Sequence, residues 1–135
     1  MRYPNVSDII ALRSEIMALY NQDSQLRDKG EAELESALMQ PQMAAYYEDA
    51  DLARQAALLI VGIAQAHPFV DGNKRAALAA GDVMIQLNGY MVHSERDEFA
   101  RQIIDAITRN DKDEGALKDF TDWLRSRLRP LTLKP

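Results

Sequence analysis

The sequence predicts an all-α protein, a single domain in which six or seven helices form one bundle. In most segments apolar residues recur three or four positions apart, which is the spacing of one face of a helix. No segment shows a convincing alternation of apolar and polar residues, the pattern typical of a half-buried strand. The chain has 135 residues, enough for one core, and no repeat or long linker divides it.

The first half of the chain contains two predicted helices and two connecting segments. Four apolar residues at helical spacing predict the first helix: Ile9, Leu12, Ile16 and Leu19. Ser7 is expected to be its N-cap. Residues 21–30 are polar and lead to a short helix that is expected to end before Pro41. Residues 42–49 have no clear period, so we expect a loop or flap there, with a short β-hairpin as the alternative.

The second half contains four predicted helices. Residues 56–64 are apolar on every side, which predicts a helix that is enclosed by others and ends at Pro68. The next helix is expected to run from Asn73 to Asn88, with Gly89 as its stop. Its small residues allow close packing on the preceding helix: Ala76, Ala77, Ala79, Ala80 and Gly81. Apolar residues at helical spacing predict two more helices: Phe99, Ile103 and Ile107, then Leu117, Phe120, Leu124 and Leu128.

The composition excludes several classes of protein. Residues 1–67 carry 5 Lys and Arg against 10 Asp and Glu, and residues 68–135 carry 11 against 11, so we expect no direct nucleic-acid binding. The longest apolar run is far shorter than the roughly 20 residues that cross a bilayer, and the N-terminus lacks the apolar core of a signal peptide. The chain has no cysteine and hence no disulfide. We therefore expect a cytoplasmic protein that does not enter a membrane.

The chemistry is concentrated in residues 67–75, His-Pro-Phe-Val-Asp-Gly-Asn-Lys-Arg, between two predicted helices. A helix that begins after Gly72 presents main-chain N–H groups and the positive end of its dipole, which suit a phosphate. Three side chains add an amide and two cations: Asn73, Lys74 and Arg75. On the other side of the loop, His67 is a candidate general base. A base opposite a phosphate site indicates phosphoryl or nucleotidyl transfer.

Each of these residues also has a purely structural interpretation. His67 could cap a helix end, and Asp71, the candidate Mg²⁺ ligand, could only cap the helix that follows it. Gly72 could be an ordinary turn residue, while Lys74 and Arg75 could form a solvated face. Cations in a first helical turn lie unfavourably against the dipole unless an anion is present, and this favours the functional interpretation.

The motif resembles the signature of the Fic/Doc superfamily and, in particular, its death-on-curing (Doc) branch, which reads His-x-Phe-x-Asp/Asn-Gly/Ala-Asn-Lys-Arg. Flanking blocks extend the resemblance over residues 26–90: Leu-Arg-Asp at 26–28, Leu-Glu-Ser-Ala-Leu at 34–38 before Pro41, and Leu-Asn-Gly-Tyr at 87–90. The resemblance implies a Fic-type helical bundle that fills residues 1–135 as one domain. It also implies roles at the site: His67 as the base, Asp71 as the ligand of Mg²⁺, and, for the phosphates of the substrate ATP, Gly72, Asn73, Lys74 and Arg75.

The resemblance also indicates which group is transferred. Relatives that transfer an adenylyl group carry glycine where this chain has Lys74, and a second arginine where it has Leu78. In the Doc branch the lysine accompanies a nucleotide bound in reverse, with its γ-phosphate presented to the base. The resemblance therefore implies a toxin that phosphorylates a Ser or Thr hydroxyl, with elongation factor Tu as the expected target and arrest of translation as the effect.

Three alternatives stay open at the level of sequence. The chain could transfer an adenylyl group to a protein hydroxyl, as many Fic proteins do. It could instead be a non-catalytic co-regulator that keeps the fold and binds an antitoxin, or a structural helical bundle without a ligand.

A second protein is expected to restrain such a toxin. Many Fic proteins carry an inhibitory motif, Ser/Thr-x-x-x-Glu-Gly/Asn, and the nearest counterpart here ends in Glu114-Gly115 but begins with Asn110. The resemblance therefore implies a toxin–antitoxin module in which the antitoxin folds a disordered tail onto the toxin. Residues 21–25 depart from the Doc pattern because they replace the usual glycines, which leaves the shape of that loop open.

Overall fold

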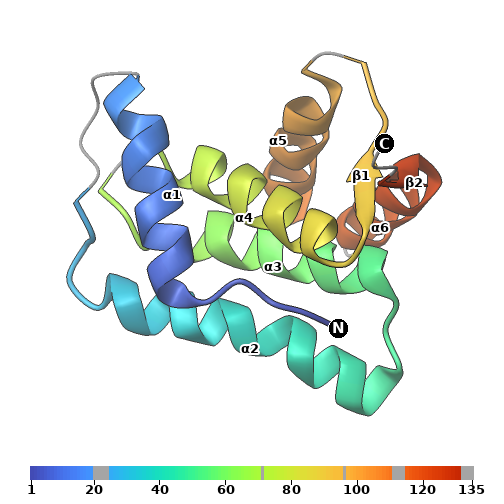
Figure 1. Ribbon diagram of the computed structural model, residues 1–135, viewed down its shortest axis with the longest axis horizontal. Coiled ribbons are helices and arrows are strands. Elements are labelled where there is room, and N and C mark those ends of the chain that lie inside the picture. The colour runs from blue at the N-terminus through green and yellow to red at the C-terminus, as the bar shows by residue number, and fades with distance from the viewer. Residues whose placement is uncertain (20–24, 71, 96, 111–114, 132–135) are drawn as a thin grey trace, which may run out of the picture.

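The computed structural model describes residues 1–19, 25–70, 72–95, 97–110 and 115–131. Its helices and strands follow one another in this order (Figure 1): α1 (Val6–Leu19), α2 (Gly30–Glu48), α3 (Leu52–Ala66), α4 (Asn73–Leu87), β1 (Tyr90–Val92), α5 (Glu98–Asn110), α6 (Gly115–Arg127) and β2 (Leu128–Pro130). The predicted all-α class and helix number are confirmed. Across the described ranges, no helix is both long and apolar enough to cross a membrane.

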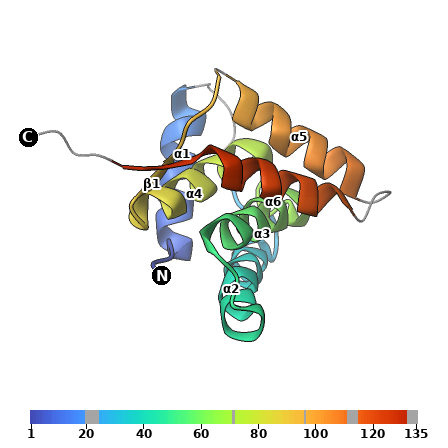
Figure 2. The same ribbon diagram turned by 90° about the vertical axis from the view of Figure 1, so that its right-hand side faces the viewer.

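Helix α3 lies at the centre of the molecule. In Figure 2, α2 covers one side of it and α5 and α6 cover the other, while α4 packs beside it. The large side chains Leu59, Ile60 and Ile63 are completely buried. The apolar character of this segment on every side predicted an enclosed helix, and the structure confirms it.

Helices α3 and α4 approach one another closely at Gly81. A side-chain carbon added at this position would overlap Ile60. Ala76, Ala77 and Ala80 are also buried on the same helix. The prediction that small residues in α4 allow close packing on α3 is therefore confirmed.

Helix α2 is longer than the sequence predicts. It continues through Pro41 to Glu48, so the predicted helix end before Pro41 and the predicted flap or hairpin at residues 42–49 were wrong. A proline inside a helix costs about 3 kcal/mol, because it removes a hydrogen bond and its ring crowds the carbonyl four residues earlier. Pro41 is buried here, however, and it continues a stripe of buried residues three or four apart: Leu34, Ala37, Leu38, Pro41 and Ala44. Tertiary packing on α3 thus overrides the local signal.

The start of α1 also differs from the prediction. The helix begins at Val6, and its cap is Asn5 rather than Ser7. The Asn5 side-chain oxygen accepts a hydrogen bond from the Asp8 N–H at 2.8 Å, and the Asp8 carboxylate accepts one from the Asn5 N–H at 3.2 Å. This reciprocal pair is a capping box, which satisfies two main-chain donors at once.

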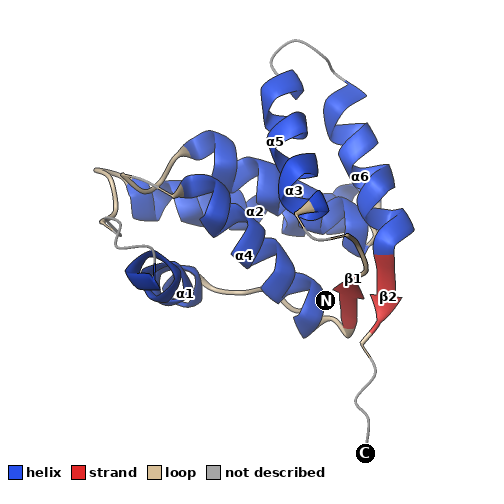
Figure 3. Ribbon diagram, turned by 90° about the horizontal axis from the view of Figure 1, so that it is seen from above, coloured by secondary structure: helices blue, strands red, loops and turns tan. Residues whose placement is uncertain are grey.

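A small antiparallel sheet, which the sequence did not predict, joins the end of α4 to the end of α6 (Figure 3). In its register Met91 of β1 lies opposite Arg129 of β2. Leu128, which was predicted in the last helix, begins β2 instead. Gly89 precedes β1 with a φ of 86° and ends α4 as predicted. Strands of three residues are too short to show an alternating pattern.

The N-terminus is fastened at the same corner of the molecule. Asn88, just after α4, accepts a hydrogen bond from the Arg2 N–H and donates one to the Arg2 carbonyl, both at 2.8 Å. The Leu131 N–H, just after β2, donates to the Gly89 carbonyl at 2.9 Å. The turn after α4 therefore holds segments from both ends of the described chain.

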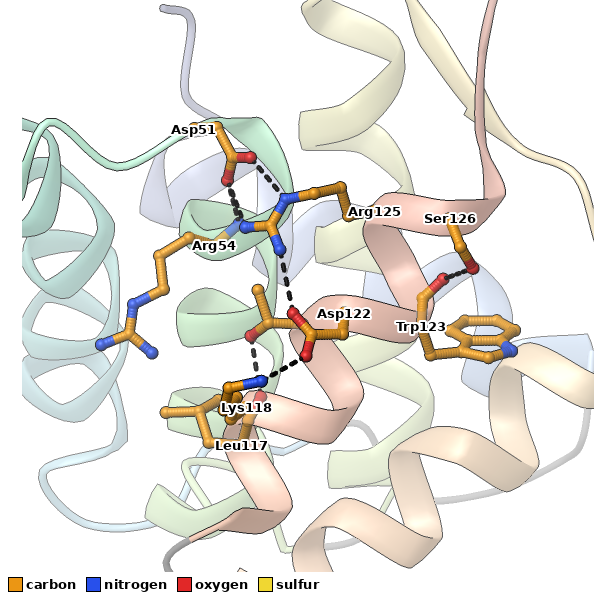
Figure 4. A network of polar contacts seen from close by, with 9 residues as sticks. Asp51, Arg54, Leu117, Lys118, Asp122, Trp123, Arg125 and Ser126 are labelled. Atoms are coloured by element: carbon orange, nitrogen blue, oxygen red, sulfur yellow. Dashed lines mark hydrogen bonds and ion pairs between the residues drawn. The ribbon is translucent and has the colours of Figure 1, made fainter.

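A polar network connects the start of α3 to α6 (Figure 4). Asp51, the N-cap of α3, accepts a hydrogen bond from the Arg54 N–H at 3.0 Å. The Arg125 guanidinium donates to both Asp51 carboxylate oxygens, at 2.7 and 3.0 Å, and to Asp122 at 3.0 Å. The hydrogen bonds from Arg125 are the main reason that the pKa of Asp51 lies below its usual value.

We predict that Gly81→Ala destabilises the protein by about 1–3 kcal/mol, as overpacking of a core usually does. In the background Ile60→Ala the added carbon has room, and the same change should cost nothing or stabilise by up to about 1 kcal/mol, because alanine is the better helix former. Urea unfolding of the four chains measures both effects. An equal cost in the two backgrounds would show that Ile60 is not what excludes a side chain at Gly81.

We also predict that the contribution of Asp51 depends on pH. Because its pKa is lower in the folded chain, the charged form stabilises the fold above the usual pKa of 3.8, and this stabilisation is lost as the pH falls below that value. Asp51→Asn keeps an N-cap oxygen but removes the charge, at a cost of about 0.2–1 kcal/mol for so exposed a pair. The difference in Tm between variant and parent should therefore be present at neutral pH and shrink near pH 3. A difference that does not change with pH contradicts the assignment.

Candidate active site

The described residues of the sequence motif lie in the short loop between α3 and α4 and in the first turn of α4, on the side of the molecule opposite β1 (Figures 1 and 3). Helix α3 ends at Ala66 and α4 begins at Asn73, so the imidazole and the first turn of α4 belong to the two ends of one loop. His67 and Gly72 both have left-handed main-chain conformations, with φ of 52° and 74°, and these reverse the chain. Phe69 between them is completely buried and anchors the loop in the core.

His67 adopts a conformation that residues other than glycine rarely adopt. Its N–H donates to the Ile63 carbonyl at 3.3 Å, and its own carbonyl accepts a hydrogen bond from the Arg27 guanidinium at 2.9 Å. Strain of this kind, about 1–3 kcal/mol, persists only where the surrounding structure imposes it. The main chain of His67 thus caps α3, as the structural interpretation held, while the residue itself is exposed to solvent. The two interpretations are compatible.

Residues 25–27 support the loop from the other side. Leu26 lies opposite Phe69 in an isolated antiparallel bridge. Main-chain hydrogen bonds flank the bridge: Arg27 N–H to the Pro68 carbonyl at 2.8 Å, and Val70 N–H to the Gln25 carbonyl at 3.0 Å. Residues 21–30 were predicted as a polar connector, and the resemblance included Leu26 and Arg27 in its Leu-Arg-Asp block, but neither predicted that this segment supports the loop. The signal for the contact is Leu26, a single partly buried leucine among polar neighbours.

The start of α2 also lies against the loop. A side-chain carbon at Gly30 would overlap the Pro68 carbonyl oxygen, so only glycine fits at this contact. The Gly30 N–H donates to the Arg27 carbonyl at 2.8 Å, which links the supporting segment to the helix. The position of His67 is therefore set by α2 as well as by α3.

Asn73 closes the loop. Its side-chain oxygen accepts a hydrogen bond from the Phe69 N–H at 2.9 Å, and its amide nitrogen donates to the Phe69 carbonyl at 3.0 Å. One hydrogen of the amide is used in this way. The main-chain N–H of Asn73 and its second amide hydrogen are the donors that this residue could offer to an anion.

Lys74 and Arg75 lie beside a hollow of about 220 Å³ between α4 and α5. Its other lining residues are apolar: Leu78, Ala100, Ile103 and Ile104. Lys74 and Arg75 supply two cations at this edge, and the first turn of α4 contains no acidic residue. The sequence predicted both cations but not that α5 would complete the hollow. A hollow with a cationic edge and apolar walls suits an anion that carries a larger, less polar group.

Asp71, the predicted ligand of Mg²⁺, lies outside the described residues. Among the residues that are described, no three or more His, Asp or Glu side chains gather into a metal site. Mg²⁺ that accompanies a nucleotide needs only one or two carboxylates, since phosphate oxygens and water supply the other ligands. One carboxylate in the motif therefore fits a metal that arrives with its nucleotide.

Comparisons with known proteins identify the family of this chain. The Fic/DOC family matches residues 3–85, which include the loop and the helices on both sides of it. Protein kinase doc of Escherichia phage P1 is 32% identical over 125 residues, which cover 93% of this chain and 94% of that protein. Toxin Doc of Mycolicibacterium smegmatis is 34% identical over 83 residues, 59% of this chain and 64% of that protein. The chain therefore belongs to the Fic/DOC family.

Within the family, the chain lies in the Doc branch. Both of these relatives bear the name Doc, one as a toxin and the other as a protein kinase. The resemblance drawn from residues 67–75 and their flanking blocks is thereby confirmed, and so is the Fic-type helical fold that it implied.

We predict that Asn73→Ala destabilises the protein by about 1–3 kcal/mol in the absence of nucleotide. Each hydrogen bond to Phe69 contributes about 0.5–1.5 kcal/mol, and the variant loses both. Urea unfolding measures the change. Asn73→Asp is the matched variant, since it keeps the acceptor but not the donor. Its stability should lie between those of the parent and Asn73→Ala. If Asn73→Ala unfolds at the same urea concentration as the parent, the side chain does not hold the loop closed.

Proposed function

We propose that this chain is a Doc-like toxin that transfers the γ-phosphate of ATP to a Ser or Thr hydroxyl of a target protein. The proposal rests mainly on one arrangement: an exposed His67 at one end of a braced loop, and a helix start with two adjacent cations at the other. The Doc relatives that match this chain support it, because one of them is named a protein kinase.

His67 acts as the general base in this proposal. A Ser or Thr hydroxyl attacks phosphorus slowly unless its proton is removed as the new O–P bond forms. The imidazole accepts this proton while the bond between the γ-phosphorus and the bridging oxygen breaks. The electron pair of that P–O bond leaves with ADP. The bond from Arg27 to the His67 carbonyl fixes the main chain, so the ring meets an incoming hydroxyl from a defined position.

The start of α4 binds the phosphates. Main-chain N–H groups after Gly72, with the charges of Lys74 and Arg75, stabilise the negative charge on the transferred group and on the departing diphosphate. Asp71 would hold Mg²⁺, which supplies further neutralisation of the phosphate oxygens when the nucleotide is bound.

Two residues favour phosphoryl over adenylyl transfer. Lys74 replaces the glycine, and Leu78 replaces the second arginine, of adenylyl-transferring relatives. Both line the hollow beside Arg75. The long side chain of Lys74 occupies space that glycine would leave open, and Leu78 is apolar where an arginine would bind a phosphate. These contacts support a nucleotide that presents its γ-phosphate to His67.

The biological setting is proposed through the Doc relatives. One of them is named a toxin, which supports a cytoplasmic toxin–antitoxin module in which a cognate antitoxin with a disordered tail restrains this chain. We propose elongation factor Tu as the target and arrest of translation as the result, as the resemblance to the Doc branch implies.

We predict that elongation factor Tu incubated with the chain and ATP takes up label from the γ-phosphate but not from the α-phosphate. His67→Ala should lower the rate at least 100-fold, since general-base catalysis contributes about 10²–10⁴-fold. His93→Ala is the matched control, because the chain's other histidine is exposed after β1, on the opposite side of the molecule. Label from the α-phosphate on the target would instead establish adenylyl transfer.

Growth of cells that express each variant is the second measurement. Wild type and His93→Ala should stop growth, and His67→Ala should not. Arrest by His67→Ala to the same extent as wild type, with no label transferred by either, would favour the non-catalytic co-regulator and contradict the proposal.

A further inference from the structure

Helix α2 presents a group of large apolar side chains to solvent. Met39, Met43, Tyr46 and Tyr47 are exposed by 51%, 51%, 82% and 74%. They recur three or four residues apart and therefore lie on one side of the helix; we call these four residues the α2 surface. Single exposed apolar residues are common on proteins, but a group on successive turns is typical of an interaction site.

The α2 surface is already organised for binding in the free chain. The rings of Tyr46 and Tyr47 pack edge to face, with centroids 4.8 Å apart and planes at 80°. Next to them is a hollow of about 290 Å³, which Met43 and Tyr47 line from α2 and which Arg54 and Leu58 line from α3. Rigid aromatic rings lose little entropy on binding, methionine adapts its shape to a partner, and the hollow can receive an apolar side chain.

The charge of α2 indicates the chemistry of the partner. The helix contains four glutamates and no lysine or arginine: Glu31, Glu33, Glu35 and Glu48. Glu48 is paired with Arg54 of α3 at 3.4 Å, so the first three supply the negative charge that a partner would meet. Glu31 and Glu35 are exposed and, by helical spacing, lie on the same side as Met39. A second copy of this chain would bring like charges together, which opposes association, whereas Lys and Arg on a partner would be attracted.

We propose that the α2 surface binds an amphipathic, basic helix of a partner protein. The apolar side of that helix covers Met39, Met43, Tyr46 and Tyr47, and its lysines or arginines lie beside the glutamates of α2. A helix that binds in this way contacts its partner through apolar residues at i, i+3 or i+4, and i+7. The proposal does not depend on the reaction proposed above.

The α2 surface is remote from the candidate active site. Gly30, at the N-terminal end of α2, contacts Pro68 of the loop, whereas the exposed residues lie toward the other end of the helix (Figure 1). At about 1.5 Å per residue, Tyr46 is about 24 Å along the helix axis from Gly30. The apolar contacts of a partner bound there are therefore distant from His67, and only its basic residues beside Glu31 and Glu35 approach the end of α2 that contacts the loop.

Two synthetic helical peptides test the proposal. One carries leucines at i, i+3 or i+4, and i+7 with lysine and arginine on its flanks, and its twin has glutamate at each basic position. The basic peptide should bind at least 10-fold more tightly at low salt, and added salt should reduce this advantage. With methionine methyl groups labelled for NMR, the signals of Met39 and Met43 should shift and that of the buried Met84 should not.

Variants of the chain complete the test. Replacing the four residues of the α2 surface with glutamine should weaken binding of the basic peptide at least 10-fold, and Glu31→Gln with Glu35→Gln should reduce its dependence on salt. Tyr90→Gln, an exposed tyrosine on β1, should bind normally and serves as the control. Circular dichroism and thermal melting verify that each variant is folded.

Several outcomes would overturn the proposal. They are equal affinity for both peptides, no shift of Met39 and Met43 up to about 1 mM peptide, or a chain that dimerises through the α2 surface in light scattering. Binding is measured without ATP, so a failure here is separate from a failure to transfer phosphate.

Discussion

The enclosure of α3 is the constraint on which the rest of the structure depends. Because this helix is apolar on every side, it must be covered on every side, and α2, α4, α5 and α6 all pack against it. Its C-terminal end is therefore fixed in space, and His67 follows that end directly. Gly81 lets α4 approach α3 closely, so the helix that begins after the loop is fixed by the same core. A reactive loop with both ends anchored in one core needs few further contacts to hold its shape.

The helices could be predicted from the sequence wherever their periodicity was local. The apolar segment of α3 and the small residues of α4 predicted an enclosed helix and a close contact, and both were found. The course of α2 could not be predicted, because Pro41 is a strong local stop and only packing on α3 keeps the helix continuous. The β1–β2 sheet was missed for a similar reason, since its pairing joins residues that are about forty positions apart and each strand is too short to show a pattern.

For the candidate site too, the sequence identified the residues whose signal is local and missed the contacts that depend on the fold. Residues 67–75 could be singled out from the sequence because their order is itself the signal, and the family resemblance that rests on this order is confirmed by the Doc relatives. The contacts that position them could not be predicted, because residues 25–27, Gly30 and α5 reach the loop only through the fold. Asn73 shows a further limit of sequence: the type of residue suggested an amide donor for phosphate, whereas the structure shows that its first use is to hold Phe69.

The turn after α4, which fastens both Arg2 and the start of the C-terminal segment, has a consequence for the order of folding. Its contacts join Arg2 to Asn88, which are 86 positions apart, and β1 to β2, which are about forty positions apart. Loops of this length are costly to close until most of the chain is compact, whereas the pairs α2–α3 and α3–α4 are neighbours in sequence. During synthesis the central helices and the reactive loop can therefore assemble on the emerging chain, and the β1–β2 pairing forms only after residue 130 has left the ribosome.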